Sequence, residues 1–310
     1  MKTLLALVAL LPLFTGLAEA AGVQRISVPV GDGSTTLEGA VWYPCAEPPG
    51  TVAFRGVEMP GVEDCPVEGE ALPLVVISHG ARGWFGGHHD TAEALADAGY
   101  VVAAITHPDQ GRRGWRTGRP AAIKSLIDYL LGAWPDAGRL DGDRIGFFGY
   151  SRGGYTGLVL IGGRPNFRRL LWHCLFAWSD PMCSSPPGAK GSDEPVEESD
   201  APATFTQDPR IRAAVIAAPL GIVFSAEGLE TVAVPLQLWR AEKDQLLIHP
   251  HHAEAVYGAL PTKPDYRVVP DAGHFAFLAP CGAAQAERVP AICLDAPEFD
   301  RVAFHRDFNA

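Results

Sequence analysis

The sequence predicts an α/β protein with a mainly parallel central sheet, helices on both faces and an N-terminal antiparallel hairpin. Segments typical of strands alternate with segments typical of helices along most of the chain, which is the pattern of a parallel sheet covered on both sides. Residues 72–78 and 100–105 are almost continuously apolar, as strands buried on both faces are. Residues 23–30 and 37–43 alternate apolar and polar side chains around Gly31-Asp32-Gly33, which predicts the hairpin.

The remaining strands and helices are expected to follow in alternation. Short apolar strand patterns occur at residues 143–148, 211–218, 234–240 and 266–270. Helical patterns occur at residues 91–98, 120–134, 152–161, 251–259 and 297–308. Two of these helices have a start signal: Asp90 is a candidate N-cap for the first, and Pro120 is expected to open the second.

Residues 21–310 are expected to form a single domain with one insertion. The alternation of strands and helices stops between residues 162 and 209, and the second half of this segment is rich in Ser, Pro, Asp and Glu. The pattern is compatible with a partial cap and equally with a solvated excursion. Trp172 and Trp178 are expected to pack the insertion onto the body of the protein.

The first twenty residues have the features of a secretory signal peptide. Lys2 supplies a positive start, residues 4–17 form the apolar stretch, and Ala18-Glu19-Ala20 is a small-x-small cleavage site. The apolar stretch is short for a membrane span, so a cleavable signal is favoured over a retained anchor. We therefore expect a secreted or periplasmic protein with no stable membrane anchor.

The composition is that of an ordinary globular protein. Of the 310 residues, 47% are hydrophobic and 20% are charged, which leaves ample apolar material for a core. The formal net charge of −11 would repel nucleic acid and anionic membranes, so neither is an expected partner. The sequence leaves the oligomeric state undetermined.

Six cysteines occur, an even number, as expected for a protein that folds in an oxidising compartment. They fall into three pairs that are local in sequence: Cys45 and Cys65, Cys174 and Cys183, and Cys281 and Cys293. Pairing within each group is the predicted connectivity among about 15 possible ones. Zinc is the rival interpretation, but no Cys-x-x-Cys occurs.

Residues 149–153 read Gly-Tyr-Ser-Arg-Gly and lie between a predicted strand and a predicted helix. Gly-x-Ser-x-Gly in this position is a nucleophile elbow, a sharp and strained turn with the serine hydroxyl at its tip, beside the positive end of the helix. Larger side chains at Gly149 and Gly153 are expected to collide with neighbouring backbone. The pattern predicts that Ser151 is a nucleophile for acyl transfer.

A serine hydroxyl reacts only with a base in hydrogen-bond reach, and the base needs an orienting acid. His274 and Asp244 each follow a predicted strand, so both are expected at the same edge of the sheet as Ser151. The chain order serine, acid, histidine is the one this architecture uses. Glu242, on the same loop as Asp244, is the alternative acid.

Two backbone N–H groups are expected to form an oxyanion hole. One belongs to Arg152, directly after the nucleophile, and the other to Ala81 in the loop after residues 72–78, with Arg82 as the alternative. Trp84 and Phe85 follow this loop and are candidates to line an acyl pocket.

His79 is expected to shape the same loop rather than to act in catalysis. His249, His251 and His252 crowd near Asp244 and raise the possibility of a metal site. Because the last two are adjacent in sequence, their side chains would diverge on a helix, and no metal site is predicted.

Three segments together resemble the α/β-hydrolase superfamily: Ser78-His79-Gly80, Gly149-Tyr150-Ser151-Arg152-Gly153-Gly154 and Asp271-Ala272-Gly273-His274-Phe275. More narrowly, they are similar to the secreted bacterial group described as predicted dienelactone hydrolases, which is related to platelet-activating-factor acetylhydrolases. The resemblance implies an α/β-hydrolase fold and a serine esterase of small or acetylated esters that needs no cofactor. It also implies Ser151 as nucleophile, His274 as base, and Ala81 with Arg152 as oxyanion donors.

The chain departs from these relatives at two points. True dienelactone hydrolases have a cysteine nucleophile where this chain has Ser151. In the acetylhydrolases the acid follows an earlier strand, but residues 219–223 contain no carboxylate here. The acid therefore falls to Asp244, a placement similar to that in secreted cutinase-like polyester hydrolases.

The sequence thus predicts a serine hydrolase that cleaves a small-molecule carboxylic ester through an acyl-enzyme intermediate. An amide or peptide hydrolase with the same triad is one alternative. A catalytically inert binding protein on a hydrolase scaffold is another.

Overall fold

The computed structural model describes residues 20–108, 114–183 and 205–310. Residues 1–19 of the predicted signal peptide (residues 1–20) and the acidic stretch of the insertion lie outside these ranges.

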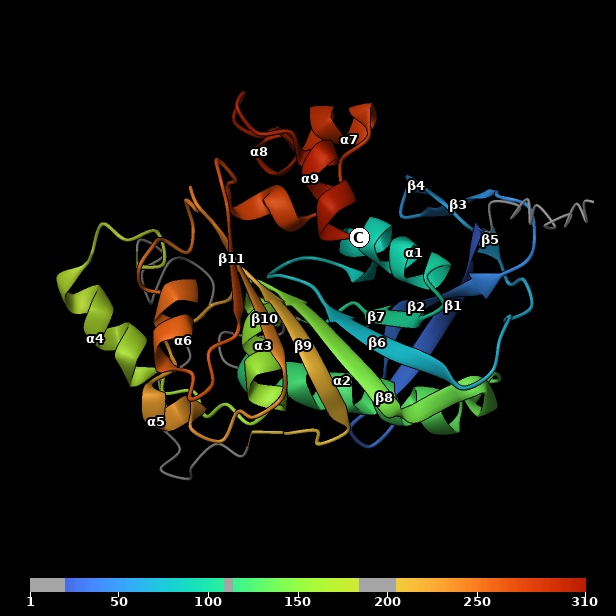
Figure 1. Cartoon of the computed structure of the whole chain (residues 1–310), viewed down its shortest axis with the longest axis horizontal. Helices are drawn as coiled ribbons and strands as arrows, with labels where there is room; N and C mark the ends of the chain where they lie inside the picture. The colour runs from blue at the N-terminus through green and yellow to red at the C-terminus, as the bar shows by residue number, and fades with distance from the viewer. Residues whose placement is uncertain (1–19, 109–113, 184–204) are drawn as a thin grey trace, which may run out of the picture.

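A nine-stranded sheet runs through the centre of the molecule (Figure 1). Its strands are β1 (Ala20–Val30), β2 (Thr35–Cys45), β5 (Val62–Glu63), β6 (Leu72–Ser78), β7 (Val101–Ile105), β8 (Leu140–Tyr150), β9 (Ile211–Ala217), β10 (Leu236–Ala241) and β11 (Asp265–Val269). The spatial order is β11-β10-β9-β8-β6-β7-β2-β1-β5. Every neighbouring pair from β11 to β7 is parallel, and β2 is antiparallel to both β7 and β1. The predicted α/β class and the N-terminal hairpin are confirmed.

Helices cover both faces of this sheet. Helices α2 (Trp115–Gly132) and α3 (Arg152–Leu160) pack on one face together with Leu74 and Val76 of β6, and α1 (His89–Asp97) and α9 (Arg301–Phe308) lie on the other face with Ile77 (Figure 1). The alternation of burial along β6 explains the two cores, because successive side chains of a strand point to opposite faces.

Shorter elements complete the fold. The other helices are α4 (Arg168–Phe176), α5 (Ala226–Leu229), α6 (Ala253–Ala259), α7 (Ala283–Arg288) and α8 (Pro290–Cys293), with single turns η1 (Phe85–His88), η2 (Ala137–Arg139) and η3 (His274–Phe277). A separate two-stranded sheet pairs β3 (Thr51–Phe54) with β4 (Val57–Pro60).

Helix α2 begins at Trp115, so the prediction that Pro120 opens it is wrong. A proline inside a helix removes the N–H that would bond the carbonyl four residues earlier, here that of Arg116. The hydroxyl of Tyr155, on α3, donates to this carbonyl at 3.0 Å instead. Tyr155 is fully buried, which raises the pKa of its hydroxyl and keeps it a donor. A side chain from the next helix therefore compensates for Pro120.

The prediction that Asp90 caps the helix at residues 91–98 is also wrong. The helix begins at His89, and Asp90 binds the C-terminal helix instead, pairing with Nδ1 of His305 and accepting from the amide of Asn309. Burial opposes ionisation of Asp90, but the hydrogen bond and charge of His305 outweigh it and lower the pKa of Asp90 to about 2. The carboxylate of Asp90 is used in a tertiary contact and does not cap its own helix.

All six cysteines form the three predicted local disulfides, with Cα–Cα distances of 6.3 Å for Cys45–Cys65, 5.2 Å for Cys174–Cys183 and 5.6 Å for Cys281–Cys293. Disulfides of this kind persist in proteins of oxidising compartments. Within the described ranges, no helix combines the length and apolar character that crossing a membrane requires.

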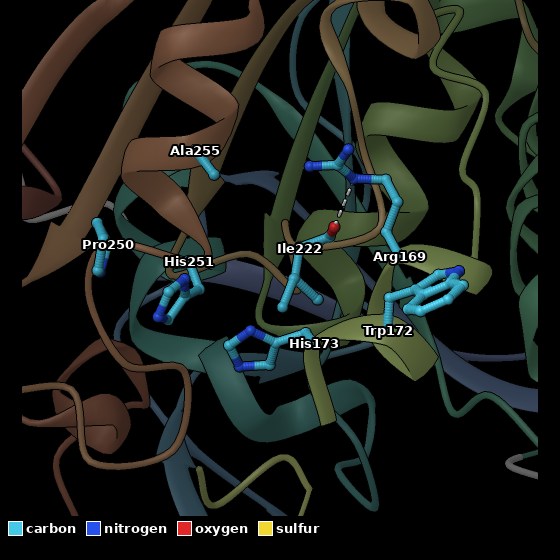
Figure 2. A pocket seen from close by; sticks show the side chains of 7 residues that line it. All are labelled: Arg169, Trp172, His173, Ile222, Pro250, His251 and Ala255. Carbon is cyan, nitrogen blue, oxygen red and sulfur yellow. Dashed lines mark hydrogen bonds between the residues drawn. The ribbon is translucent and has the colours of Figure 1, made fainter. Parts of the chain in front are cut away.

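Helix α4, in the insertion, has no buried residue. Trp172 is 59% exposed and Trp178 is 80% exposed, so the prediction that they pack the insertion onto the body is wrong. The helix is instead attached to the body by Nε of Arg169, which donates to the carbonyl of Ile222 at 3.1 Å (Figure 2), and by Leu170, which packs against the core. The disulfide between Cys174 and Cys183 closes a loop within the insertion. These contacts leave the apolar side of α4 facing solvent.

The burial of Glu93, on α1, can be tested through its effect on stability. Burial, reinforced by the nearby charges of Asp97 and Asp90, raises the pKa of Glu93 to about 8. The folded state then retains a proton that the unfolded chain releases above pH 4.5, so this residue makes stability fall as pH rises from about 4.5 to 8. We expect Glu93→Gln to match the wild type at pH 5 and to melt about 2–4 °C higher at pH 8.5, the shift that ~1 kcal/mol produces in a domain of roughly this size.

Thermal melts at the two pH values check this expectation. Glu287→Gln makes the same charge change at an exposed position and serves as the control. An equal shift at both pH values, or an equal shift in the control, would contradict a buried neutral carboxyl at Glu93.

Candidate active site

Ser151 lies at the tip of the turn between β8 and α3, in a backbone conformation with φ 56° and ψ −114°. Residues other than glycine rarely adopt a positive φ, and such strain persists only where the surroundings impose it. Two hydrogen bonds do so: the N–H of Ser151 donates to the carbonyl of Ala217 at 2.9 Å, and its carbonyl accepts from the N–H of Leu220 at 3.1 Å. The last residue of β9 and the loop after it thus hold the turn from both sides.

The glycines of the motif are required by contact with backbone. A Cβ added at Gly153 would lie 1.8 Å from the carbonyl oxygen of Ser78, and one at Gly149 would lie 2.4 Å from the carbonyl oxygen of Gly153. No real Cβ makes contacts this short, and backbone cannot move aside as a side-chain end can. A side chain at either glycine would therefore collide with backbone, as the motif predicts.

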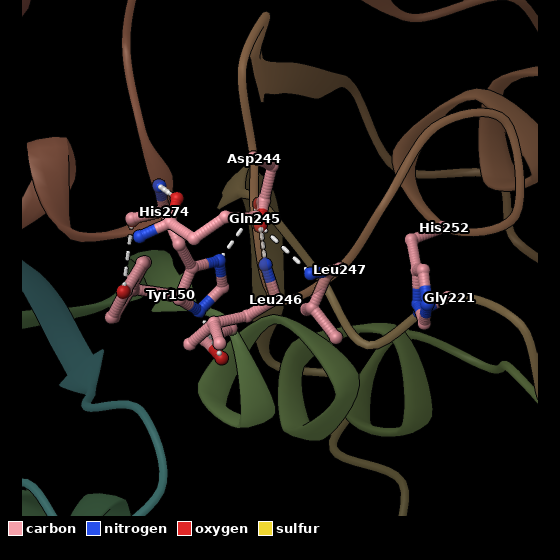
Figure 3. Close-up of polar contacts among 9 residues, drawn as sticks. Tyr150, Gly221, Asp244, Gln245, Leu246, Leu247, His252 and His274 are labelled. Atoms are coloured by element: carbon pink, nitrogen blue, oxygen red, sulfur yellow. Dashed lines mark hydrogen bonds and ion pairs between the residues drawn. The ribbon is translucent and has the colours of Figure 1, made fainter. Parts of the chain in front are cut away.

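The structure brings Ser151, His274 and Asp244 together although they come from three separate loops. Figure 3 shows His274 beside Asp244. Nε2 of His274 lies 3.0 Å from Oγ of Ser151, and Nδ1 lies 2.7 Å from Oδ2 of Asp244. The exposed fractions of the His274 and Asp244 side chains are 3% and 5%. A carboxylate only accepts hydrogen bonds, so Nδ1 carries the ring proton and Nε2 is left to accept from the hydroxyl.

Asp244 is held as an acceptor by its own loop. Its second oxygen, Oδ1, accepts from the N–H groups of Leu246 at 2.9 Å and Leu247 at 2.7 Å (Figure 3). The alternative acid, Glu242, points elsewhere, and its Oε2 accepts from the N–H of Asp271 at 3.0 Å. Of the two candidate carboxylates, the structure brings Asp244 to the imidazole.

Two further residues orient His274, and the sequence analysis missed both. Oε1 of Gln245 accepts from the N–H of His274 at 2.9 Å, and the hydroxyl of Tyr150 donates to its carbonyl at 2.9 Å. Burial, together with the charge of Asp244, raises the pKa of Tyr150, so the hydroxyl remains protonated. Their only sequence signal is position, because Tyr150 precedes the serine and Gln245 follows the acid.

The loop after β6 passes directly beside Ser151. A Cβ on Gly80 would lie 3.4 Å from the Cβ of Ser151. The buried guanidinium of Arg119 donates to the carbonyls of His79 at 2.6 Å and Gly80 at 3.0 Å. Because a trans peptide holds C=O and N–H on opposite sides, pinning the Gly80 carbonyl turns the N–H of Ala81 away from Arg119.

His79 lies within this scaffold. Its Nε2 accepts from the N–H of His107 at 3.0 Å, so Nδ1 carries the proton and donates to the carbonyl of Gly80 at 2.7 Å. Burial lowers the pKa of His107 well below its ordinary value, and its Nε2 contacts the hydroxyl of Ser78 at 2.8 Å. The hydrogen bonds of both imidazoles therefore stabilise the conformation of the loop after β6.

Arg152 begins α3, so its N–H belongs to the first turn of that helix, where backbone donors point out of the N-terminus. Its guanidinium lies over the ring of Trp115, 4.4 Å from the ring centroid. The structure thus places the predicted donor residues, Ala81 and Arg152, on the two segments that flank Ser151, with Arg82 next to Ala81.

The two aromatic residues predicted to line an acyl pocket lie differently. Phe85 is 2% exposed and packs edge-on against Phe54, with ring centroids 5.2 Å apart. A side chain this deeply buried has no surface to offer a substrate, so an acyl-pocket role is not supported for Phe85. Trp84 is half-buried beside it, and its role stays a prediction.

The histidines near Asp244 have separate partners. His249 pairs with Glu254 at 2.6 Å, Nδ1 of His252 accepts from the N–H of Gly221 at 3.3 Å, and the ring of His251 lies 4.5 Å from that of His173. Burial lowers the pKa of His252 to about 4, which keeps it neutral.

Elsewhere in the described chain, one cluster has the spacing of metal ligands. Single atoms of His173, Asp180 and Cys183 lie within 4.8 Å of one another. Cys183 is bonded to Cys174, so its sulfur offers no thiolate.

No protein-family model matches the chain. No curated protein is similar to it in sequence. The geometry of the site is therefore the basis for assigning it a chemistry.

The contact at Gly153 makes a testable prediction about stability. We expect Gly153→Ala to lower the free energy of unfolding by about 3 kcal/mol or to prevent folding, because the new methyl group overlaps the backbone of Ser78. Gly258→Ala is the matched control: a Cβ there meets no atom within 4 Å, and alanine favours its helix by about 0.5–1 kcal/mol. Chemical denaturation measures both, and a Gly153→Ala protein as stable as the control would refute the close approach of α3 to β6.

Proposed function

We propose that this protein is a serine hydrolase that cleaves carboxylic esters of small molecules through an acyl-enzyme intermediate. The observation that carries the proposal is the hydrogen-bonded chain from Asp244 through His274 to Ser151, with contacts of 2.7 and 3.0 Å. Each member has the acceptor or donor role that nucleophilic catalysis by serine requires.

In the proposed mechanism, Nε2 of His274 removes the hydroxyl proton as Oγ of Ser151 attacks the ester carbonyl carbon. Asp244 stabilises the imidazolium that forms. The imidazolium then gives the proton to the leaving alcohol oxygen, and the acyl group stays on Ser151. A water molecule, deprotonated by the same imidazole, attacks the acyl-enzyme, releases the carboxylic acid and restores the serine.

The oxyanion that develops during each attack requires donors already in position, because reorienting them would oppose the reaction. The N–H groups of Arg152 and Ala81 are the proposed donors. Two features support them: Arg152 lies in the first turn of α3, and Arg119 anchors the carbonyl of Gly80 on the other side of the Ala81 peptide.

The same features support an α/β-hydrolase fold. A strand–elbow–helix unit lies in the middle of the mainly parallel sheet, and the acid and histidine follow later strands in the order that this fold uses. The resemblance to secreted predicted dienelactone hydrolases and to platelet-activating-factor acetylhydrolases favours small or acetylated esters. The three disulfides fit a secreted or periplasmic protein.

The nucleophile is tested by Ser151→Ala. We expect kcat for p-nitrophenyl acetate to fall by at least about 10⁴-fold, because no other group can form the acyl-enzyme. A fluorophosphonate probe should label the wild type and leave the variant unlabelled. Far-UV circular dichroism and the melting temperature of the variant establish that it is folded.

Turnover that survives in folded Ser151→Ala would refute the proposed mechanism. Wild-type protein that is neither labelled nor active on any ester would point to an inert binding protein. Comparing p-nitrophenyl acetate with p-nitroacetanilide separates ester from amide cleavage.

The acid is tested by Asp244→Asn, with Glu242→Gln as the matched control on the same loop. An amide in place of Asp244 can donate to Nδ1, which favours the tautomer that cannot accept from Ser151, so kcat is expected to fall by about 10³–10⁴-fold. Glu242 contacts the backbone of Asp271, and its loss should change kcat only a few-fold. The reverse ranking would transfer the role of acid to Glu242.

A further inference from the structure

A cavity of about 390 Å³ lies between the inserted helix α4, the loop after β9 and the start of α6 (Figure 2). Its lining residues are Arg169, Trp172, His173, Ile222, Pro250, His251 and Ala255. The volume is in the range of pockets that bind small molecules. No step of the mechanism proposed above uses any of these side chains.

One wall of the cavity belongs to the loop that holds the backbone of Ser151. Ile222 comes two residues after Leu220, whose N–H donates to the carbonyl of Ser151 at 3.1 Å. Two residues span at most about 7 Å of chain, so Ile222 lies only a short length of chain from the hydrogen bond that holds the carbonyl of Ser151. The other wall is tied to the same loop, because Gly221 packs against His252, next to the lining residue His251.

Arg169 supplies the cationic group of the cavity. Its Nε donates to the carbonyl of Ile222 at 3.1 Å, which fixes the plane of the guanidinium across the top of the cavity (Figure 2). Among the described residues, Arg169 forms no ion pair, whereas Arg164 and Arg210 each bind carboxylates. An oriented guanidinium is suited to bind a carboxylate in a bidentate manner.

The remainder of the lining is flat or apolar. The rings of His173 and His251 lie 4.5 Å apart below the guanidinium, and the indole of Trp172 lies beside them (Figure 2). Burial and the neighbouring His173 lower the pKa of His251, so this ring is uncharged at neutral pH. Asp180, buried behind His173, accepts from it at 2.8 Å and so holds its ring in place. These surfaces fit a planar ring.

We propose that this cavity binds a planar group bearing a carboxylate, so that the preferred substrates are esters carrying an aromatic or similarly conjugated acid. The inference rests on the proposed ester hydrolysis and names its substrate class. The group is held by stacking and by Arg169 while the ester carbonyl lies at Ser151. The specificity would arise from the insertion, because α4 contributes the guanidinium and two of the rings.

The test compares esters of nearly the same shape that carry either a carboxylate or its neutral amide, with each kcat/KM divided by the rate of hydroxide-catalysed hydrolysis of the same ester. 4-Acetoxybenzoate and the longer 4-acetoxycinnamate present a carboxylate at two distances from the acetyl group, and their primary amides are the neutral counterparts. We expect kcat/KM of a carboxylate ester to exceed that of its amide by about tenfold or more, which is the effect of a charge-assisted hydrogen bond.

Two variants of α4 test whether Arg169 is the source of the preference for a carboxylate. Arg169→Gln should bring the carboxylate-to-amide ratio of kcat/KM close to one. Arg168→Gln removes the same charge one residue away, at an exposed position outside the lining, and should keep the wild-type ratio. An equal fall of the ratio in both variants would mean that only long-range charge is involved and would overturn the site.

The outcomes separate this inference from the proposed function. If the wild type hydrolyses p-nitrophenyl acetate in a Ser151-dependent manner but shows a ratio of one, the substrate assignment fails and the hydrolase stands. If no ester is cleaved at all, the hydrolase itself fails. If cinnamate quenches tryptophan fluorescence in the wild type but not in Arg169→Gln, while the ratio is one, the cavity is a separate anion site and the assignment to substrate is overturned.

Discussion

The candidate site depends on one close approach of backbone to backbone. Helix α3 lies so near strand β6 that a Cβ on Gly153 would be 1.8 Å from the carbonyl oxygen of Ser78. This approach allows the turn at Ser151 to be tight enough for a positive φ, and it brings the loop after β6 alongside the hydroxyl. The elbow, the first turn of α3 and the loop with the proposed oxyanion donor are therefore parts of one steric arrangement.

The acid and the histidine reach Ser151 because their loops are bonded to each other. The N–H of Lys243 donates to the carbonyl of Ala272 at 2.9 Å, and Gln245 accepts from His274. Lys243 and Asp271 add an ion pair at 2.6 Å across the same loops. Neighbouring parallel strands β10 and β11 end side by side, so short cross-loop bonds are enough to align Asp244 with Nδ1. The geometry rests on backbone and side-chain contacts between the two loops.

Several elements show why sequence patterns alone misplace details. Proline inside α2 is tolerated because Tyr155, on a different helix, supplies the missing hydrogen bond, and no local pattern reports that partner. Asp90 has the sequence position of a cap, but His305 and Asn309 compete for its carboxylate. Trp172 and Trp178 are apolar enough for a core, yet the insertion is attached through Arg169 and Leu170 and leaves both tryptophans exposed. In each case a long-range contact overrode a local preference.

The sequence by itself determined the α/β class, the hairpin, the local disulfides and the candidate residues Ser151, His274 and Asp244. These follow from short-range rules: strand and helix periodicity, the glycines of a tight turn, and the order of residues after successive strands. Only the tertiary structure decided that Asp244 and not Glu242 meets the imidazole, that Tyr150 and Gln245 orient it, and that Phe85 belongs to the core. Those outcomes depend on which loops lie side by side in space, and the distance between side chains far apart in the chain is set by packing that no local pattern encodes.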